Sequence, residues 1–241
     1  HSSFIAIAHA RLVTNGVATD ERNNQPVNYG HINMVHNGII VNSSDLWSSN
    51  SNLTRSSDVD TEICAALLDS YSLNNTAEKA TQLLFEQIHG AASIAWLSNQ
   101  TNKLTLATNT GDLFWSSVDC GNNTALVFAS QPTFLPDKLS KCPISAVRQL
   151  LPGHALSVTS KGTHKFIINE SKPYLETEFF DLHNFSHKSH VLRTKILPNS
   201  SVVKYPQGIL KYNCKSLREI KRCTKCILPS TFPFINFDAN G

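Results

Sequence analysis

Two amphipathic helical stretches, set between groups of short apolar runs, most strongly constrain the fold of this chain. In 60–71 and 76–88 the apolar residues recur at the spacing of one helix face, and Asp58 is a candidate N-cap for the first stretch. The short apolar runs on either side are typical of strands. Helices grouped between runs of mostly antiparallel strands indicate an α+β layered domain. The expected strands are 3–8, 32–36, 92–97, 104–108, 112–116, 125–129, 154–159 and 164–168.

Composition narrows the class of protein. The 241 residues, 41% of them hydrophobic, suffice for one full core and an appendage. The net charge of +3 is small and gives no reason to expect a nucleic-acid partner, and no apolar run is long enough to span a bilayer. The six cysteines show no disulfide-like spacing, and Cys120, Cys142 and Cys214 are interpreted as free thiols. This usage predicts a reducing compartment and a cytoplasmic location.

Three polar segments follow apolar runs in the first quarter of the chain. Arg11 carries a rigid fork of donors suited to a carboxylate. Asn37 and Gly38 place a side-chain amide beside an unhindered backbone N–H, which is the chemistry of an oxyanion hole. The acids of segment 57–62 could hold an amino group. Together these groups predict a site that hydrolyses an amino-acid side-chain amide.

Each of these features has a simpler interpretation when taken alone. Arg11 could be a structural arginine paired with an acid on a neighbouring strand. Asn37-Gly38 is also a hairpin-turn signal. Acids at the start of a helix, such as Asp58, Asp60 and Glu62, favour the helix dipole. The order and spacing of all three features favour the amidase interpretation.

The motifs also occur in the order known from one family. Ala-His-Ala-Arg-Leu-Val-Thr-Asn-Gly (8–16), Asn-Gln-Pro (24–26), His-Asn-Gly-Ile-Ile-Val-Asn (36–42) and Asp-Thr-Glu (60–62) follow one another. Over about residues 4–168 the chain resembles the glutaminase domain of the class II, N-terminal-nucleophile (Ntn) glutamine amidotransferases, as in glucosamine-6-phosphate synthase and asparagine synthetases. The resemblance implies a four-layer αββα sandwich of the Ntn-hydrolase type and no cofactor for this domain.

The resemblance also implies roles for individual residues. Arg11 would bind the glutamine carboxylate and Asp60 its ammonium group, while Thr14 would line the pocket. Asn37 and Gly38 would stabilise the tetrahedral oxyanion. These are the expected substrate-binding and catalytic residues of this chain.

The family's nucleophile has no counterpart here. It is a cysteine at the mature N-terminus, whose own α-amino group is the general base, whereas residue 1 is His1 and no cysteine precedes Cys64. We therefore expect the chain to be an N-terminally truncated fragment that is inactive alone, although the complete protein would be an enzyme.

The end of the chain resembles the start of another group of enzymes. Cys223-Thr-Lys-Cys226, followed by Pro229 and by Phe237-Asp238, is similar to the beginning of the ATP-dependent N-acetyl-sugar amidotransferases, which are asparagine-synthetase-like. In those enzymes a second Cys-x-x-Cys follows, and two such pairs have the ligand spacing of a structural zinc site. Cys223 and Cys226 would then be half of a zinc site.

Three regions are expected from these resemblances. They are a glutaminase domain over 1–175, a linker over 176–218 and the beginning of a zinc-ribbon or ATP-dependent synthetase-like domain over 219–241. ATP, Mg²⁺ and zinc would belong to the downstream domain, outside this chain.

Three functions stay open. The first is a glutaminase domain that supplies ammonia to a synthetase domain of the same chain, acting on an N-acetyl sugar. The second is the glutaminase domain of an enzyme that makes amino-sugar phosphates, and the third is a non-catalytic glutamine-binding module. The expected partners are glutamine and the downstream domain, with neither nucleic acid nor membrane, and a homodimer stays open.

Overall fold

The computed structural model describes residues 4–10, 20–119, 121, 124–139, 141–168, 208–211, 219–224, 228–230 and 237. The chain divides into two compact units, His1–Leu210 and Lys211–Gly241. All the helices and strands named below lie in the first unit. The expected linker over 176–218 falls mostly outside the described residues, so the three domain boundaries stay predictions.

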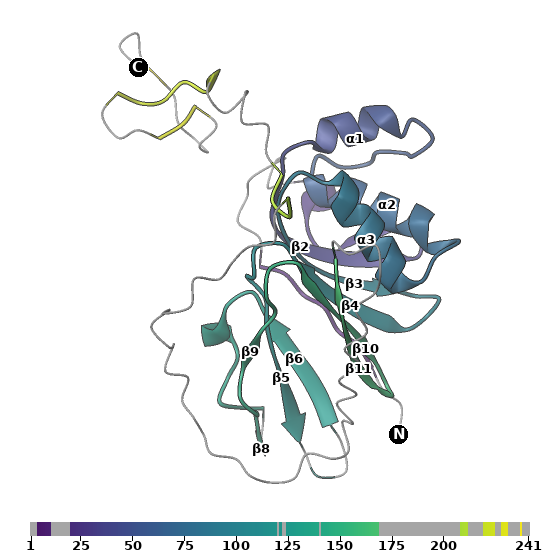
Figure 1. Ribbon diagram of the computed structural model, residues 1–241, viewed down its shortest axis with the longest axis vertical. Coiled ribbons are helices and arrows are strands. Elements are labelled where there is room, and N and C mark those ends of the chain that lie inside the picture. The colour runs from purple at the N-terminus through teal and green to yellow at the C-terminus, as the bar shows by residue number, and fades with distance from the viewer. Residues whose placement is uncertain are drawn as a thin grey trace. The chain divides into compact units, whose positions relative to one another are not determined.

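A six-stranded antiparallel sheet forms the centre of the first unit (Figure 1). Each strand pairs with its neighbours in the order β1-β2-β3-β4-β10-β11, so chain segments far apart in sequence lie side by side. The strands are β1 (Val27–Tyr29), β2 (Ile32–Ile40), β3 (Gly90–Ser98), β4 (Lys103–Thr108), β10 (His154–Thr159) and β11 (Gly162–Ile167).

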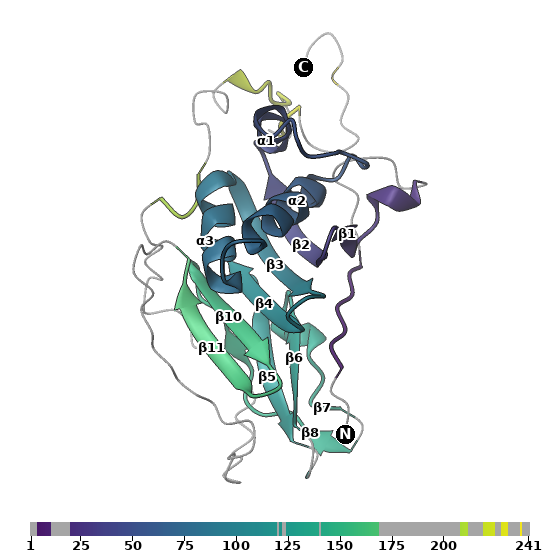
Figure 2. The ribbon, with the colours of Figure 1, turned by 90° about the vertical axis from the view of Figure 1, so that its right-hand side faces the viewer.

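Two smaller sheets lie on the other side of the large sheet from the helices (Figure 2). One has the order β6-β5-β9 and the other pairs β7 with β8. Their strands are β5 (Phe114–Asp119), β6 (Thr124–Ala129), β7 (Lys138–Leu139), β8 (Cys142–Pro143) and β9 (Arg148–Gln149).

The two long helices form where the apolar periodicity places them. Thr76 caps α3, because its hydroxyl accepts a hydrogen bond from the Lys79 N–H at 3.3 Å. The N-cap of α2 is Val59, so the prediction of Asp58 is wrong; the Asp58 carboxylate instead lies 3.4 Å from Arg55. The helices are α1 (Ser43–Ser49), α2 (Asp60–Ser72) and α3 (Ala77–Gln87), with short 3₁₀ turns η1 (Glu21–Asn23) and η2 (Pro132–Phe134).

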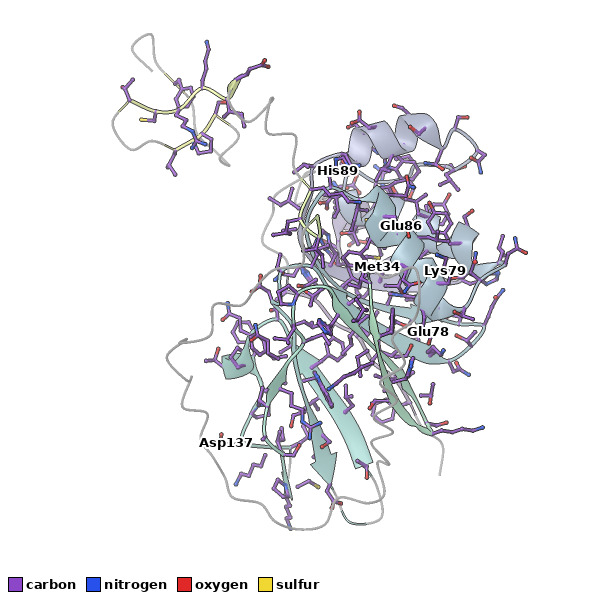
Figure 3. The ribbon with its side chains drawn as sticks, in the orientation of Figure 1. Met34, Glu78, Lys79, Glu86, His89 and Asp137 are labelled. Atoms are coloured by element: carbon purple, nitrogen blue, oxygen red, sulfur yellow. The ribbon has the colours of Figure 1, made fainter. Side chains whose placement is uncertain are left out.

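Two hydrophobic cores hold these layers together. The first lies between the helices and the large sheet and includes the fully buried Met34, labelled in Figure 3, and Trp96. The second lies between the large and small sheets and includes Leu106, Leu156 and Trp115. The expected α+β sandwich is thereby confirmed: the helices pack on one face of the large sheet, and the small sheets pack on its other face. A second helical layer is not seen among the described residues.

Some expected elements differ from the structure. The described part of the expected strand 3–8 forms no ladder, so that prediction is wrong; an apolar run becomes a strand only where a neighbour supplies hydrogen bonds. The strand expected over 112–116 is shifted to Phe114–Asp119, because Gly111 adopts a positive φ of 86° and turns the chain first.

One cysteine also differs from expectation. Cys142 is disulfide-bonded, so its interpretation as a free thiol is wrong. Because such bonds are rare in reducing compartments, the cytoplasmic location loses part of its support and stays a prediction. Among the residues that the structure describes, no helix is long and apolar enough to cross a membrane.

Candidate functional site

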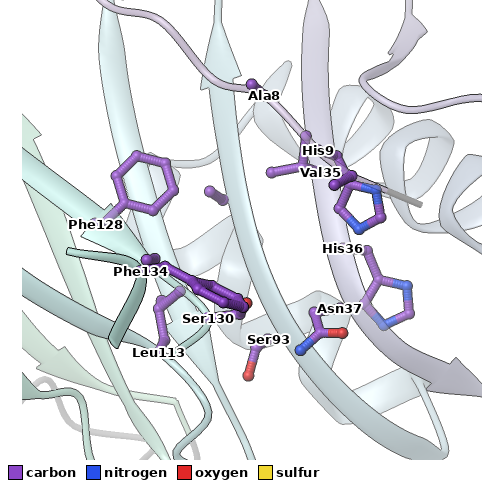
Figure 4. Close-up of a pocket in the computed structure, with 13 residues that line it drawn as sticks. Ala8, His9, Val35, His36, Asn37, Ser93, Leu113, Phe128, Ser130 and Phe134 are labelled. Atoms are coloured by element: carbon purple, nitrogen blue, oxygen red, sulfur yellow. The ribbon is translucent and has the colours of Figure 1, made fainter. Parts of the chain in front are cut away.

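A cavity of about 270 Å³ lies where the N-terminal segment, β2, β3 and the small sheet meet (Figure 4). Asn37 and Ser93 contribute polar atoms to its lining. Leu113, Phe128 and Phe134 contribute apolar and aromatic surface. A small pocket with few polar groups on an otherwise apolar lining is the usual form of a site for a small molecule.

Asn37 and Ser93 lie directly opposite each other in the β2–β3 register. The hydroxyl of Ser93 is hydrogen-bonded to the hydroxyls of Thr108 at 2.7 Å and Thr110 at 3.2 Å. These bonds fix the Ser93 side chain, whereas Asn37 is exposed to the cavity and leaves its amide available. The polar part of the cavity therefore has one anchored hydroxyl and one available amide.

The backbone of β2 explains where the N–H of Gly38 points. In an antiparallel strand the N–H groups of alternate residues face the same edge. The N–H of His36 donates to Gln25 Oε1 at 2.6 Å, and the N–H of Ile40 donates to Asp60 Oδ2 at 2.7 Å. The alternation places the Gly38 N–H on this same edge, between two neighbours that are each bonded to a side chain.

Only glycine fits at position 38. Its φ is +141°, and a Cβ built there would collide with the carbonyl oxygen of Ala91 and lie 2.9 Å from the His36 ring. The backbone of Gly38 is therefore closely surrounded on the side where other residues carry their side chain. This close packing fixes the peptide group that carries the candidate oxyanion donor.

His36 connects this strand to the start of α2. Its ring Nδ1 lies 3.3 Å from the Thr61 hydroxyl, and its Nε2 lies 3.3 Å from the carbonyl oxygen of Ala91. Burial lowers the pKa of His36, although Asp60, 3.9 Å away, and the bond to Ala91 oppose this shift. A neutral ring can donate from Nε2 to Ala91 and accept from Thr61 at Nδ1.

Asp60 lies at the start of α2, beside the edge of β2 that carries the N–H groups of His36 and Ile40. It is buried, its carboxylate is bonded to the backbone of Ile40, and it is not one of the residues that line the cavity. Gly38 likewise is not among the residues that line the cavity, although its neighbour Asn37 is. The contact of Asp60 with the glutamine ammonium group stays a prediction.

The loop before α2 is held by a buried carboxylate. Glu62 accepts hydrogen bonds from the N–H groups of Ser56 at 2.9 Å and Ser57 at 2.8 Å, and from both serine hydroxyls. The N–H of Asp58 donates to the side chain of the buried Asn23 at 2.9 Å. Glu62 and Asn23 therefore fix the path by which the chain reaches Asp60.

The remaining expected site residues are only partly visible. Arg11, Thr14 and Cys226 lie outside the described residues. Cys223 is half-buried. Within the described ranges no group of three or more His, Cys, Asp or Glu side chains gathers as a metal site would require. The zinc half-site stays a prediction.

The sequence motifs do not point to Ser93, Phe128 or Phe134. These residues come from the opposite strand β3, from β6 of the small sheet and from η2. The one available signal is Ser130-Gln131-Pro132, a polar break directly after the apolar strand that contains Phe128. Asn37 can be found from its own sequence motif. Its neighbours in the cavity are brought there by the pairing of strands and the packing of the sheets.

The chain is similar to known proteins. The family described as glutamine amidotransferase domain matches residues 9–137. The glutamine–fructose-6-phosphate aminotransferase (isomerizing) of Rhizobium meliloti is 24% identical over 228 residues, which covers 89% of this chain and 36% of that protein. The enzyme of the same name from Bradyrhizobium diazoefficiens is 32% identical over 113 residues, which covers 46% of this chain and 18% of that protein.

A solved structure shows the same fold. The glutamine phosphoribosylpyrophosphate amidotransferase from B. subtilis superposes with a TM-score of 0.50 at 21% identity, covering 65% of this chain and 34% of that chain. The present chain therefore spans about a third or less of the length of each of these proteins.

Proposed function

The chain belongs to the class II glutamine amidotransferase domain family, and from that membership we propose that it is the glutaminase domain of a larger glutamine-dependent enzyme. The observation that carries the proposal is that the Asn37 amide lines a small cavity, next to Gly38, whose N–H lies on an edge of β2. At about 270 Å³ the cavity falls just below the roughly 300–1,000 Å³ typical of small-molecule sites. This size favours a ligand of amino-acid dimensions.

The proposed reaction begins with a cysteine that precedes His1 in the longer protein. Its thiol loses a proton to the α-amine, and the sulfur attacks the amide carbon of the glutamine side chain. The electron pair of the carbonyl moves to its oxygen, which accepts hydrogen bonds from the Asn37 amide and the Gly38 N–H. Collapse expels ammonia, with the proton held by the α-amine, and leaves a thioester. Water then releases glutamate and restores the thiol.

Cys64 is unsuited to the role of nucleophile. It is fully buried within the first core, and burial, together with the nearby charge of Asp60, raises the pKa of its thiol. A thiol that stays protonated in an apolar core attacks poorly. The nucleophile must therefore come from another cysteine, as the proposed reaction requires.

We propose that the ammonia passes to a downstream ATP-dependent synthetase that acts on an N-acetyl sugar. Support comes from the Cys223-x-x-Cys226 segment, whose surroundings resemble the start of such asparagine-synthetase-like enzymes. ATP, Mg²⁺ and zinc would be bound by that downstream domain. Sequencing the gene beyond Gly241 tests this: a second Cys-x-x-Cys and a glycine-rich ATP loop are the expected result.

A second candidate is the glutaminase domain of an enzyme that aminates a sugar phosphate. It is favoured by the relatives named glutamine–fructose-6-phosphate aminotransferase. A phosphosugar isomerase domain after Gly241 would support this second candidate. If neither domain nor an N-terminal cysteine occurs in the gene, a glutamine-binding module without catalysis is the remaining function.

The first biochemical test is titration calorimetry with L-glutamine. We expect Arg11→Ala to weaken binding by about tenfold or more, because charge-assisted hydrogen bonds to a carboxylate are lost. Arg22→Ala is the matched control, since that arginine is exposed and pairs with Asp20. Absence of glutamine binding by the folded protein would overturn the proposal.

The role of Asn37 requires the complete protein. Asn37→Ala should lower glutamine hydrolysis by about 10²–10³-fold, the usual effect of removing one oxyanion donor, and leave synthesis from added ammonia intact. An equal loss of both activities would contradict this role for Asn37.

A further inference from the structure

We propose that Gln25 and Asn109 are positioning residues for the Asn37–Gly38 pair. Each side-chain amide makes the hydrogen bonds that the backbone of a neighbouring strand would make, Gln25 beside β2 and Asn109 beside β3. The inference rests on the proposed function, since it concerns the same site. It is carried by the hydrogen bonds of the two amides and by the registers of the sheet.

The first replacement occurs where β1 begins. Val27 pairs with Met34, so two residues further out the register would set residue 25 opposite His36. The ladder stops before that point, and Pro26 has no N–H to donate. Instead the Gln25 side chain accepts from the His36 N–H at 2.6 Å and donates to the His36 carbonyl at 3.1 Å. His36 thus receives both hydrogen bonds that a neighbouring strand would give.

The second replacement occurs where β4 ends, at Thr108. The next residue, Asn109, donates its own N–H to the Ala92 carbonyl at 3.0 Å. Its side chain then accepts from the Ala92 N–H at 2.7 Å and donates to the Gly90 carbonyl at 2.9 Å. Ala92 is the partner of Gly38 in the β2–β3 register. The amide of Asn109 therefore fixes the backbone directly across from Gly38.

A side-chain amide beside β2 leaves the N–H of Gly38 unoccupied, whereas a full neighbouring strand would not. A strand beside β2 would bond to every second residue and so occupy the N–H of Gly38. A single side-chain amide bonds to His36 alone, and Asp60 bonds to Ile40. The flanking residues are held while the N–H between them stays on an open edge. Donors fixed in advance of the reaction are what stabilises a developing oxyanion.

A purely structural role makes a different prediction from a positioning role. If the amides only finish the ends of a ladder, replacing them lowers stability and leaves glutamine binding unchanged. If they position the site, replacing them also moves the Gly38 peptide and weakens binding. Two isosteric changes separate these roles: Gln25→Glu and Asn109→Asp keep the size of each side chain but remove its N–H donors.

The experiment compares these variants with Gln82→Glu in the ¹⁵N-labelled chain. Gln82 donates to the Ile167 carbonyl at 2.9 Å from α3, so the control also loses an amide donor to a backbone oxygen, but away from the cavity. We expect Gln25→Glu and Asn109→Asp to shift the Gly38 amide resonance and to weaken glutamine binding by about three- to tenfold. Gln82→Glu should lower only the melting temperature and leave the Gly38 resonance and glutamine binding unchanged.

Folded Gln25→Glu and Asn109→Asp variants that bind glutamine as the parent chain does would overturn the inference. If Gln25→Glu fails to fold, Asn109→Asp and the isosteric Gln25→Met decide by the same criteria. If the parent chain itself binds no glutamine, the proposed function fails separately. The Gly38 resonance of the unliganded variants then decides: a shift beyond that of Gln82→Glu supports positioning, and an unmoved resonance overturns it.

Discussion

At the residue scale, Gly38 is a position with little tolerance for change. Gly38→Ala would place a methyl group against the Ala91 carbonyl at a φ of +141°, so both the backbone and the available space oppose it. We expect a loss of about 2–4 kcal/mol in the free energy of unfolding, measured by urea denaturation.

Gly121→Ala is the control for this change. Gly121 also has a positive φ, of 78°, but a Cβ there would meet nothing within 4 Å. Its loss should be only about 1 kcal/mol, the cost of the left-handed backbone without a collision. Equal losses in the two variants would show that the space around Gly38 can relax.

His36 gives the first unit a pH dependence. Its pKa in the folded chain is lowered from 6.5, mainly by burial, so the unfolded chain binds a proton that the folded chain refuses. The associated stability is complete above pH 6.5 and is lost as the pH falls toward the folded pKa, at up to about 1.4 kcal/mol per pH unit.

The measurement is the free energy of unfolding from pH 8 to about pH 5. His36→Gln should remove this part of the slope, whereas His31→Gln, at an exposed position, should keep it. A slope that is the same in His36→Gln and the parent chain would mean that another group is responsible.

The candidate site could be predicted in part. Asn37 and Gly38 are adjacent in sequence, so one motif reveals both. The β2–β3 register brings Ser93 opposite Asn37, and Gln25 reaches His36 by its side chain from just before β1. No local sequence pattern specifies either contact. The carboxylate of Asp60 is bonded to the Ile40 N–H, and its contact with the glutamine ammonium group stays a prediction.

At the scale of elements, Glu78 joins α3 to two strands of the large sheet (Figure 3). Its carboxylate accepts hydrogen bonds from Lys103 on β4 at 2.8 Å and from Ser157 on β10 at 2.8 Å. Burial alone would raise the pKa of Glu78, but these bonds prevail and lower it from 4.5 to about 2. The carboxylate is therefore stabilised in its charged form.

We expect Glu78→Gln to reduce the free energy of unfolding by about 2 kcal/mol at pH 7. The folded pKa is depressed, so this stability is present above pH 4.5 and is lost as the pH falls toward 2. The deficit of the variant should shrink over that range in chemical denaturation. A double-mutant cycle with Lys103→Met isolates the ion pair, and zero coupling at pH 7 would contradict its contribution.

Elements with a strong apolar period were the most predictable. The helices expected over 60–71 and 76–88 appear as Asp60–Ser72 and Ala77–Gln87, and the strand His154–Thr159 matches its expected range. In contrast, α1 (Ser43–Ser49) was not expected, because its sequence is mostly serine and only Leu46 is buried. Tertiary contacts, rather than propensity, decide such short elements.

At the scale of the whole molecule, the cavity is a product of layering. Val35 and Ala95 belong to the large sheet, and Phe128 comes from the small one, yet all three line the same space. A cavity between two sheets depends on how the sheets pack, which the order of motifs along the chain does not specify. The motifs therefore predict that a site exists near Asn37 but not which residues of the small sheet line it.

The division of the chain into two units gives the last prediction. The residues of both hydrophobic cores lie within His1–Leu210, and none of the described residues of Lys211–Gly241 belongs to either core. Units shorter than about 40 residues rarely fold without a metal or disulfides, and Cys223 with Cys226 would supply at most two of four zinc ligands. We expect a chain that ends at Leu210 to keep its melting temperature within about 2 °C of the full chain, by calorimetry. A fall of more than about 5 °C would show that the short unit stabilises the first, and the layered cores would then not suffice by themselves.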